Sequence, residues 1–145
     1  MKINTKIRYG LRVLIELGLN ESNTGMFQKD IAHNQQLSEK YLDPIIAALK
    51  TSGIVSNFGG KKSGYMLSRP PSEITIYDVY RTFEPELSIV HCVNKPYTCF
   101  ISRLCAANEY WMGLNTLITK YLTKTTLKDI IDKHNKVKKN YKNKL

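Results

Sequence analysis

The spacing of apolar residues changes at Gly53, and this change constrains the fold more than any other feature of the sequence. Before it, residues 4–19, 26–35 and 38–51 carry apolar side chains three or four positions apart, which predicts three amphipathic helices. After it, the runs IVSNF and YMLS flank the turn sequence GGKKSG, which predicts two short strands joined as a hairpin. The chain is therefore predicted to be mainly α-helical with one small β-hairpin.

The order of these elements defines the first region of the chain. Three helices followed by a two-stranded wing are the arrangement of a winged helix-turn-helix, so we assign residues 1–70 to a DNA-binding region of this class. Pro44 gives two ways to draw the third helix. It either lies inside a helix that begins after Ser38, at a cost of about 3 kcal/mol, or it opens a shorter helix capped by Asp43.

The remainder of the chain is predicted to be helical, because Pro70 and Pro71 end the hairpin and no further strand pattern follows. The divisions that we expect are a connecting helix at residues 71–90, a cysteine sensor loop at 91–105, a long helix and a terminal helix at 106–133, and a basic, disordered tail at 134–145.

The long helix carries a wide apolar stripe made by Trp111, Leu114, Leu117, Ile118 and Tyr121. A single small domain has little core left for such a stripe once its first three helices have packed. A partner chain would cover the stripe, so we expect a homodimer whose interface is this helix. The alternative is that the stripe belongs to the core of its own chain.

The net charge of +10 is concentrated at the two ends of the chain. All charged residues before the first acid, Glu16, are basic, and no acid follows Asp132 in the lysine-rich tail. A positive balance of this size attracts polyanions, nucleic acid first and an anionic membrane second, although a charged tail also serves solubility. No apolar run is long enough to span a membrane, so we expect a cytoplasmic protein without a membrane partner.

The three cysteines of the chain, Cys92, Cys99 and Cys105, fall within fifteen residues in the spacing C-x6-C-x5-C. Their odd number and the expected reducing compartment argue against a disulfide framework. Structural zinc sites usually have a closer cysteine pair, whereas several soft thiolates from one loop suit an iron–sulfur cluster, either 2Fe–2S or 4Fe–4S. Burial of one cysteine as a small apolar residue remains an alternative, best suited to Cys105.

A cysteine-dependent enzyme is a competing interpretation. Such an enzyme requires a histidine and an acid around the nucleophile. His33 lies in the expected helix-turn-helix and His134 in the tail, which leaves only His91 near the thiols. The sequence therefore favours a binding protein over an enzyme.

Five features occur in a characteristic order: MKINTKIRYGLRVLIEL, SEKYLDPIIAALKTSGIV, a wing ending in SGYMLS, the helix ITIYDV, and a three-cysteine loop before a long helix. In this order and spacing they resemble the Rrf2 family of winged-helix transcription regulators, which includes iron–sulfur and nitric-oxide sensors. The resemblance implies a homodimer that places one helix-turn-helix per subunit in successive major grooves of promoter DNA. It also implies a cluster at the cysteines, labile or absent in purified protein, that modulates this binding.

On this basis the candidate DNA contacts lie on the basic N-terminus, the helix-turn-helix and the wing. They are Lys2, Arg8, Gln28, Ser38, Lys40, Tyr41, Asp43, Lys61 and Lys62. Tyr41 is ambiguous because its ring fits the apolar stripe of its helix while its hydroxyl suits a phosphate. The wing lysines are flexible point charges, which favours phosphate contact over base reading.

The fourth ligand of a cluster is not evident in the sequence. Asn108 occupies the position at which iron–sulfur relatives carry histidine, and Arg8 the position at which nitric-oxide sensors carry an aspartate from the other subunit. His91, Glu109 or an external ligand are the alternatives. A thiol-based redox switch or a zinc site on the same winged-helix fold is the competing function.

Overall fold

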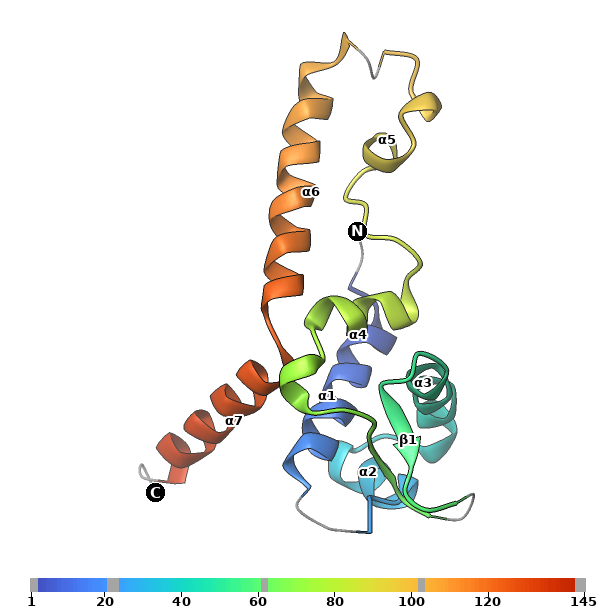
Figure 1. Cartoon of the computed structure of the whole chain (residues 1–145), viewed down its shortest axis with the longest axis vertical. Coiled ribbons are helices and arrows are strands. Elements are labelled where there is room, and N and C mark those ends of the chain that lie inside the picture. The colour runs from blue at the N-terminus through green and yellow to red at the C-terminus, as the bar shows by residue number, and fades with distance from the viewer. Residues whose placement is uncertain (1–2, 21–23, 61–62, 102–103, 143–145) are drawn as a thin grey trace.

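The structure is a computed structural model that describes residues 3–20, 24–60, 63–101 and 104–142. A winged-helix body lies at one end, and a long helix and the cysteine segment extend from it (Figure 1). The helices are α1 (Thr5–Leu19), α2 (Gln28–Gln35), α3 (Glu39–Thr51), α4 (Ile76–Phe83), α5 (His91–Asn94), α6 (Ala106–Lys124) and α7 (Leu127–Lys142). The remaining elements are the strands β1 (Val55–Asn57) and β2 (Tyr65–Leu67) and the 3-10 turns η1 (Pro71–Glu73) and η2 (Pro96–Thr98). The prediction of a mainly helical winged fold is confirmed.

The first helix begins where a polar cap is available. The Asn4 side chain accepts a hydrogen bond from the backbone N–H of Ile7 at 2.9 Å, which satisfies one of the free donors at the helix start. The apolar faces of α1, α2 and α3 then meet in one core. Its fully buried members include Val13, Leu14, Ile31, Leu42, Ile45 and Leu49.

The third helix runs through Pro44 without interruption. It begins at Ser38, whose Oγ accepts from the Tyr41 N–H at 3.2 Å, so the shorter helix capped by Asp43 is wrong. Pro44 lies on the exposed face, while Leu42 and Ile45 on either side of it are fully buried. Burial along one continuous face therefore offsets the backbone donor that Pro44 lacks.

The wing is tied to the body by backbone hydrogen bonds. β1 and β2 pair antiparallel, with Val55 opposite Leu67. Beyond the paired strands, the Met26 N–H donates to the Tyr65 carbonyl at 2.9 Å and the Tyr65 N–H donates to the Met26 carbonyl at 2.7 Å. Gly64 makes this approach possible, because a Cβ on it would lie 2.6 Å from the backbone of Gly25 and Met26. The wing is thus held beside the segment that leads into α2.

The connecting helix α4 joins the winged helix to α6. Thr75 and Asp78 form a reciprocal capping box at its start. Its inner face contributes to a second buried cluster, formed by Ile7, Tyr80 and Leu87, against which Ile118 and Leu122 of α6 pack. Among the described residues, the C-terminal half of α6 therefore packs on the body through Ile118 and Leu122, and its other half runs beside the cysteine segment (Figure 1).

Two expectations for the C-terminal region are wrong. The tail from residue 134 was expected to be disordered, but α7 continues as helix to Lys142. Residues 127–142 contain neither Gly nor Pro, lysine is a good helix former, and lysines near the C-terminus complement the helix dipole. The segment 91–105 was expected to be a loop, but it contains α5 and η2.

We predict that Gly64→Ala destabilises the wing. A Cβ would overlap the backbone of residues 25–26, and backbone cannot move aside as a flexible side chain can. Overpacking of this kind costs about 1–3 kcal/mol, which thermal unfolding followed by circular dichroism would detect. Met66→Ala, on the exposed side of the same wing, is the control and should change stability little. Equal stability of the two variants would contradict the packing argument.

Candidate nucleic-acid interface and cysteine segment

The N-terminal half of α3 presents a polar, exposed surface. Ser38, Lys40, Tyr41 and Asp43 are all exposed there. Gln28 on α2 lies behind them, and its Nε2 donates to the Glu39 carbonyl at 3.1 Å and to Asp43 Oδ1 at 2.5 Å. Gln28 and Asp43 therefore fix the angle between α2 and α3 in addition to being candidate DNA contacts.

Tyr41 packs on α1 rather than in the main core. Its ring meets Tyr9 edge-on, with ring centroids 5.6 Å apart and an interplanar angle of 81°. The guanidinium groups of Arg8 and Arg12 lie 5.8 Å and 5.2 Å from the Tyr9 centroid. These four side chains form a basic aromatic surface beside the recognition helix, suited to phosphate contact. Sequence reasoning missed Arg12 as a site residue, although its place in the basic N-terminal run was a usable signal.

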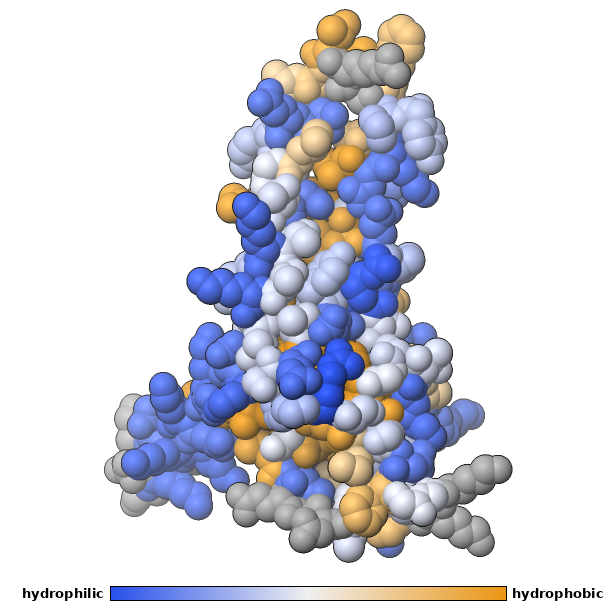
Figure 2. Space-filling view, viewed as in Figure 1, coloured by the Kyte–Doolittle hydropathy of each residue, from blue (hydrophilic) through white to orange (hydrophobic). Residues whose placement is uncertain are grey.

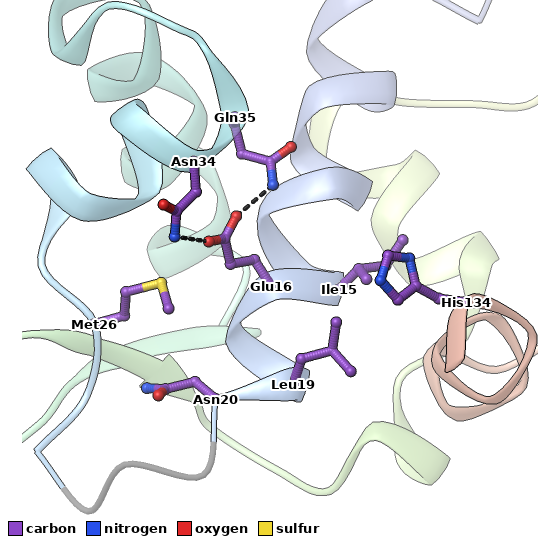
Figure 3. A pocket seen from close by; sticks show the side chains of 8 residues that line it. All are labelled: Ile15, Glu16, Leu19, Asn20, Met26, Asn34, Gln35 and His134. Carbon is purple, nitrogen blue, oxygen red and sulfur yellow. Dashed lines mark hydrogen bonds between the residues drawn. The ribbon is translucent and has the colours of Figure 1, made fainter. Parts of the chain in front are cut away.

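The C-terminal end of α2 is braced by α1. Glu16 accepts hydrogen bonds from the side-chain amides of Asn34 and Gln35 (Figure 3). Arg12 also donates two hydrogen bonds to Gln35. Its Nε donates to the side-chain oxygen of Gln35 at 2.7 Å, and its Nη2 donates to the backbone carbonyl of Gln35 at 2.8 Å. Glu16, Asn34 and Gln35 border an open cavity of about 450 Å³ that is also lined by Met26 and by His134 of α7. This network holds the helix-turn-helix as one unit with α1.

Three of the candidate DNA contacts, Lys2, Lys61 and Lys62, lie outside the described residues. The structure describes the wing residues that come before and after Lys61 and Lys62. Gly59 and Gly60 have φ angles of 68° and 144°, and Ser63 turns back through its N–H and hydroxyl, both of which donate to the Gly60 carbonyl. Positive φ is accessible to glycine without a side-chain clash, which explains these residues at the tip.

The apolar stripe on α6 divides into two faces. Ile118 packs into the second buried cluster of its own chain, and Trp111 and Leu114 are half-buried. Leu117 and Tyr121 are 65% and 67% exposed. The exposed face continues as a groove of about 530 Å³ lined by Ala106, Glu109, Tyr110, Gly113, Leu114 and Leu117.

The three cysteines are half-buried, and none of them forms a disulfide. Cys92 lies in α5, Cys99 directly follows η2 and Cys105 directly precedes α6. Among the described residues, no group of three or more Cys, His, Asp and Glu side chains is placed to hold a metal ion. The structure therefore keeps the thiols on one segment without gathering them around one point.

The cysteine segment is anchored at its beginning and exposed at its tip. Asn115 of α6 accepts from the Ile89 N–H at 3.1 Å through its side-chain oxygen, and Asn94 donates to the Leu87 carbonyl at 3.1 Å. Nearby, Tyr80 is packed in the second buried cluster, and burial raises the pKa of its phenol. Phe100 and Leu104, by contrast, are almost completely exposed. Figure 2 shows hydrophobic surface at the end of the molecule farthest from the winged helix.

The helix-turn-helix, the wing bonded to it and the exposed N-terminal end of α3 are the parts of a winged-helix, DNA-binding transcription regulator. A family model named Rrf2 and described as an iron-dependent transcriptional regulator matches residues 3–133, and the chain belongs to this family. The resemblance inferred from the sequence is confirmed.

Two curated relatives and two solved structures place the chain among regulators rather than enzymes. CymR of Bacillus subtilis is 33% identical over 130 residues, which cover 90% of this chain and 89% of CymR. NsrR of Bacillus licheniformis is 32% identical, with coverage of 96% and 98%. The solved structure of CymR, described as the global cysteine regulator of B. subtilis, aligns with a TM-score of 0.76 at 32% identity over 91% of this chain and 97% of that one. T. potens IscR aligns with a TM-score of 0.71 at 28% identity over 92% and 88%.

None of the described helices has the length and apolar character needed to cross a bilayer.

Ser38 provides a prediction that separates capping from DNA contact. Ser38→Ala should lower stability by about 1 kcal/mol, because the Tyr41 N–H loses its acceptor. Ser38→Asp keeps an acceptor and should restore stability, but its negative charge should weaken DNA binding by repelling phosphate. Thermal unfolding and fluorescence anisotropy with duplex DNA measure the two effects. If Ser38→Asp binds DNA as tightly as the wild type, Ser38 does not lie near the phosphates.

Proposed function

We propose that this chain is a homodimeric regulator that binds promoter DNA in the cytoplasm, and that an iron–sulfur cluster held by Cys92, Cys99 and Cys105 modulates this binding. The observation that carries the proposal is three half-buried thiols on one short segment, attached to the helix that leads back to the winged helix. Membership in a family described as iron-dependent supports it.

The donor set fits such a cluster in residue type and in its spacing along the sequence, and the three thiols would have to be drawn together to hold it. Three thiolates within fourteen residues are soft ligands that suit iron. The chain has only three cysteines, so a fourth ligand has to be another kind of group. We propose either Glu109, in the first turn of α6, or an external ligand. When bound, the cluster would provide a group that oxidants, nitric oxide or iron limitation can alter or remove.

The chain itself supplies the route from this segment to the DNA. Leu87, just before the segment, is buried with Ile7 of α1 and Tyr80 of α4. α1 in turn packs against α3 and braces α2 through Glu16. An ordered cysteine segment would therefore hold Leu87, and with it the base of α1, in one position.

In the proposed complex, α3 enters the major groove with Ser38, Lys40, Tyr41 and Asp43 nearest the bases and phosphates. Arg8 and Lys2 on the N-terminal side, and Lys61 and Lys62 on the wing, are proposed phosphate contacts. Gln28 acts mainly by positioning Asp43.

The exposed face of α6 is proposed as the dimer interface. Leu117 and Tyr121 project from it beside the groove of about 530 Å³. A second copy would bury this face, with Trp111, Leu114 and Ile118 at the edge that also meets the core of their own chain. Two helix-turn-helix units would then be held at a fixed separation, as two half-sites require.

A thiol-based redox switch is the second candidate function. It is favoured by the separated placement of the three thiols among the described residues and by the absence of His or Asp at the two positions used in related sensors, Asn108 and Arg8. The similarity to CymR, described as a global cysteine regulator, points in the same direction.

The dimer proposal predicts different results for neighbouring residues of α6. Leu117→Asp should give a folded monomer, because a carboxylate would be buried without a partner in an apolar interface. Thr116→Asp, at an exposed position that does not line the groove, should stay dimeric and is the control. Light scattering gives the mass and circular dichroism the fold. A dimeric Leu117→Asp variant would remove this face from the interface.

The cluster proposal predicts stoichiometric iron and sulfide, together with visible absorption, in protein purified without oxygen. Replacing any one of Cys92, Cys99 or Cys105 by Ala should abolish that absorption and leave the helical content unchanged. Asn108→Ala should have little effect, whereas Asn108→His should prolong the absorption in air by supplying a ligand. Protein that stays colourless after reconstitution with iron and sulfide would favour the thiol switch.

A further inference from the structure

The last part of α7 is an exposed helix. Leu127 and Ile131 anchor the helix in the main core, and His134 lies beside Ile15 of α1 (Figure 3). From Asp132 to Lys142 every residue is exposed. We refer to residues 133–142 as the α7 arm, which stands away from the body (Figure 1).

The charge of the arm is positive, and Lys133 at its start also interacts with Asp129 of the preceding turn. The arm carries Lys133, Lys136, Lys138, Lys139 and Lys142 and no acid. The acids of α7 precede the arm and have other partners. Asp132 forms a salt bridge with Lys128 at 2.8 Å. Asp129 accepts hydrogen bonds from the N–H and the hydroxyl of Thr126 at the helix start, and these bonds lower the pKa of Asp129. Lysines three and four positions apart in the arm repel one another. An anionic partner would relieve this repulsion.

The composition of the arm distinguishes among anionic partners. A helix that binds a membrane surface presents a broad face of large apolar side chains. In the arm only Val137 and Tyr141 are of this kind, each 68% exposed, and they form a narrow strip while the five lysines occupy most of the remaining helix surface. Closely spaced phosphates on a duplex match such a helix better, since they neutralise lysines without requiring apolar contact.

The position of the arm separates it from the recognition helix. α1 packs against α3 and also against α7, and the two helices lie on different sides of it (Figure 1). We propose that the α7 arm is a second, sequence-independent DNA-binding surface, which holds the phosphates of a duplex stretch other than the one in contact with α3. This proposal rests on DNA binding by the winged helix and is independent of the cysteine chemistry.

A protein that holds two stretches of duplex can pass from one to the other without first dissociating into solution. Its release from a labelled duplex therefore becomes faster as the concentration of a competing duplex rises. A protein whose DNA-binding surfaces all contact the same duplex stretch is released at a rate that does not depend on the competitor.

The test compares this release for three full-length proteins by stopped-flow anisotropy, with random-sequence duplexes as both label and competitor. The wild type should show acceleration by competitor. Lys139→Gln/Lys142→Gln should lose most of it and should also reduce the slope of log affinity against log salt, by about 0.9 for each phosphate contact removed. Lys139→Arg/Lys142→Arg keeps the charge and should behave as the wild type.

Wild-type acceleration in the Gln variant would overturn the proposal. A reduced salt slope with no change in acceleration would also overturn it, because the arm would then contact the same duplex as α3. So would arm-dependent binding to phosphatidylcholine vesicles containing phosphatidylserine with unchanged DNA transfer, which would assign the arm to a membrane. Wild-type protein without any salt-dependent duplex binding would instead contradict DNA binding by the winged helix itself, a result distinct from a defect confined to the arm.

Discussion

The burial of α1 is the constraint on which the rest of the structure depends. This one helix packs against α2, α3, α4, α7 and the second strand of the wing. Two glycines allow its closest contacts: a Cβ on Gly10 would lie 2.6 Å from the Phe83 ring of α4, and a Cβ on Gly18 would overlap Ile131 of α7. The helix-turn-helix, the connecting helix and the C-terminal helix are therefore positioned by their separate contacts with the same scaffold.

Much of the fold could be predicted from the sequence because its signals are local. The periods of apolar residues, the cap at Asn4 and the turn at Gly53 place the first three helices and the wing. Pro44 and the lysine tail are different, since the outcome depends on tertiary context. Burial on both sides of Pro44 keeps α3 continuous, and anchoring by Leu127 and Ile131 extends helix into a segment whose charge alone suggests disorder.

The candidate site was predictable in its location but not in its connections. The exposure of Ser38, Lys40, Tyr41 and Asp43 agrees with their assignment to a recognition surface. The hydrogen bond from Gln28 to Asp43 and the edge-on contact of Tyr41 with Tyr9 join separate helices, so no local pattern could indicate them. The division of the α6 stripe likewise depends on where α4 lies, because α4 covers Ile118 and leaves Leu117 exposed.

The half of α6 that extends beyond the body has a mechanical consequence. A helix of 19 residues is about 28 Å long, and in the described part of the chain its C-terminal half packs on the body. Such a lever magnifies a small rotation at its base into a large displacement at its tip, and for the same reason it diminishes a push applied at the tip. Chemistry at the cysteines is therefore poorly placed to act on the winged helix by displacement. A change in stiffness is not diminished in this way, so a signal that firms or loosens the cysteine segment is the kind this architecture can transmit.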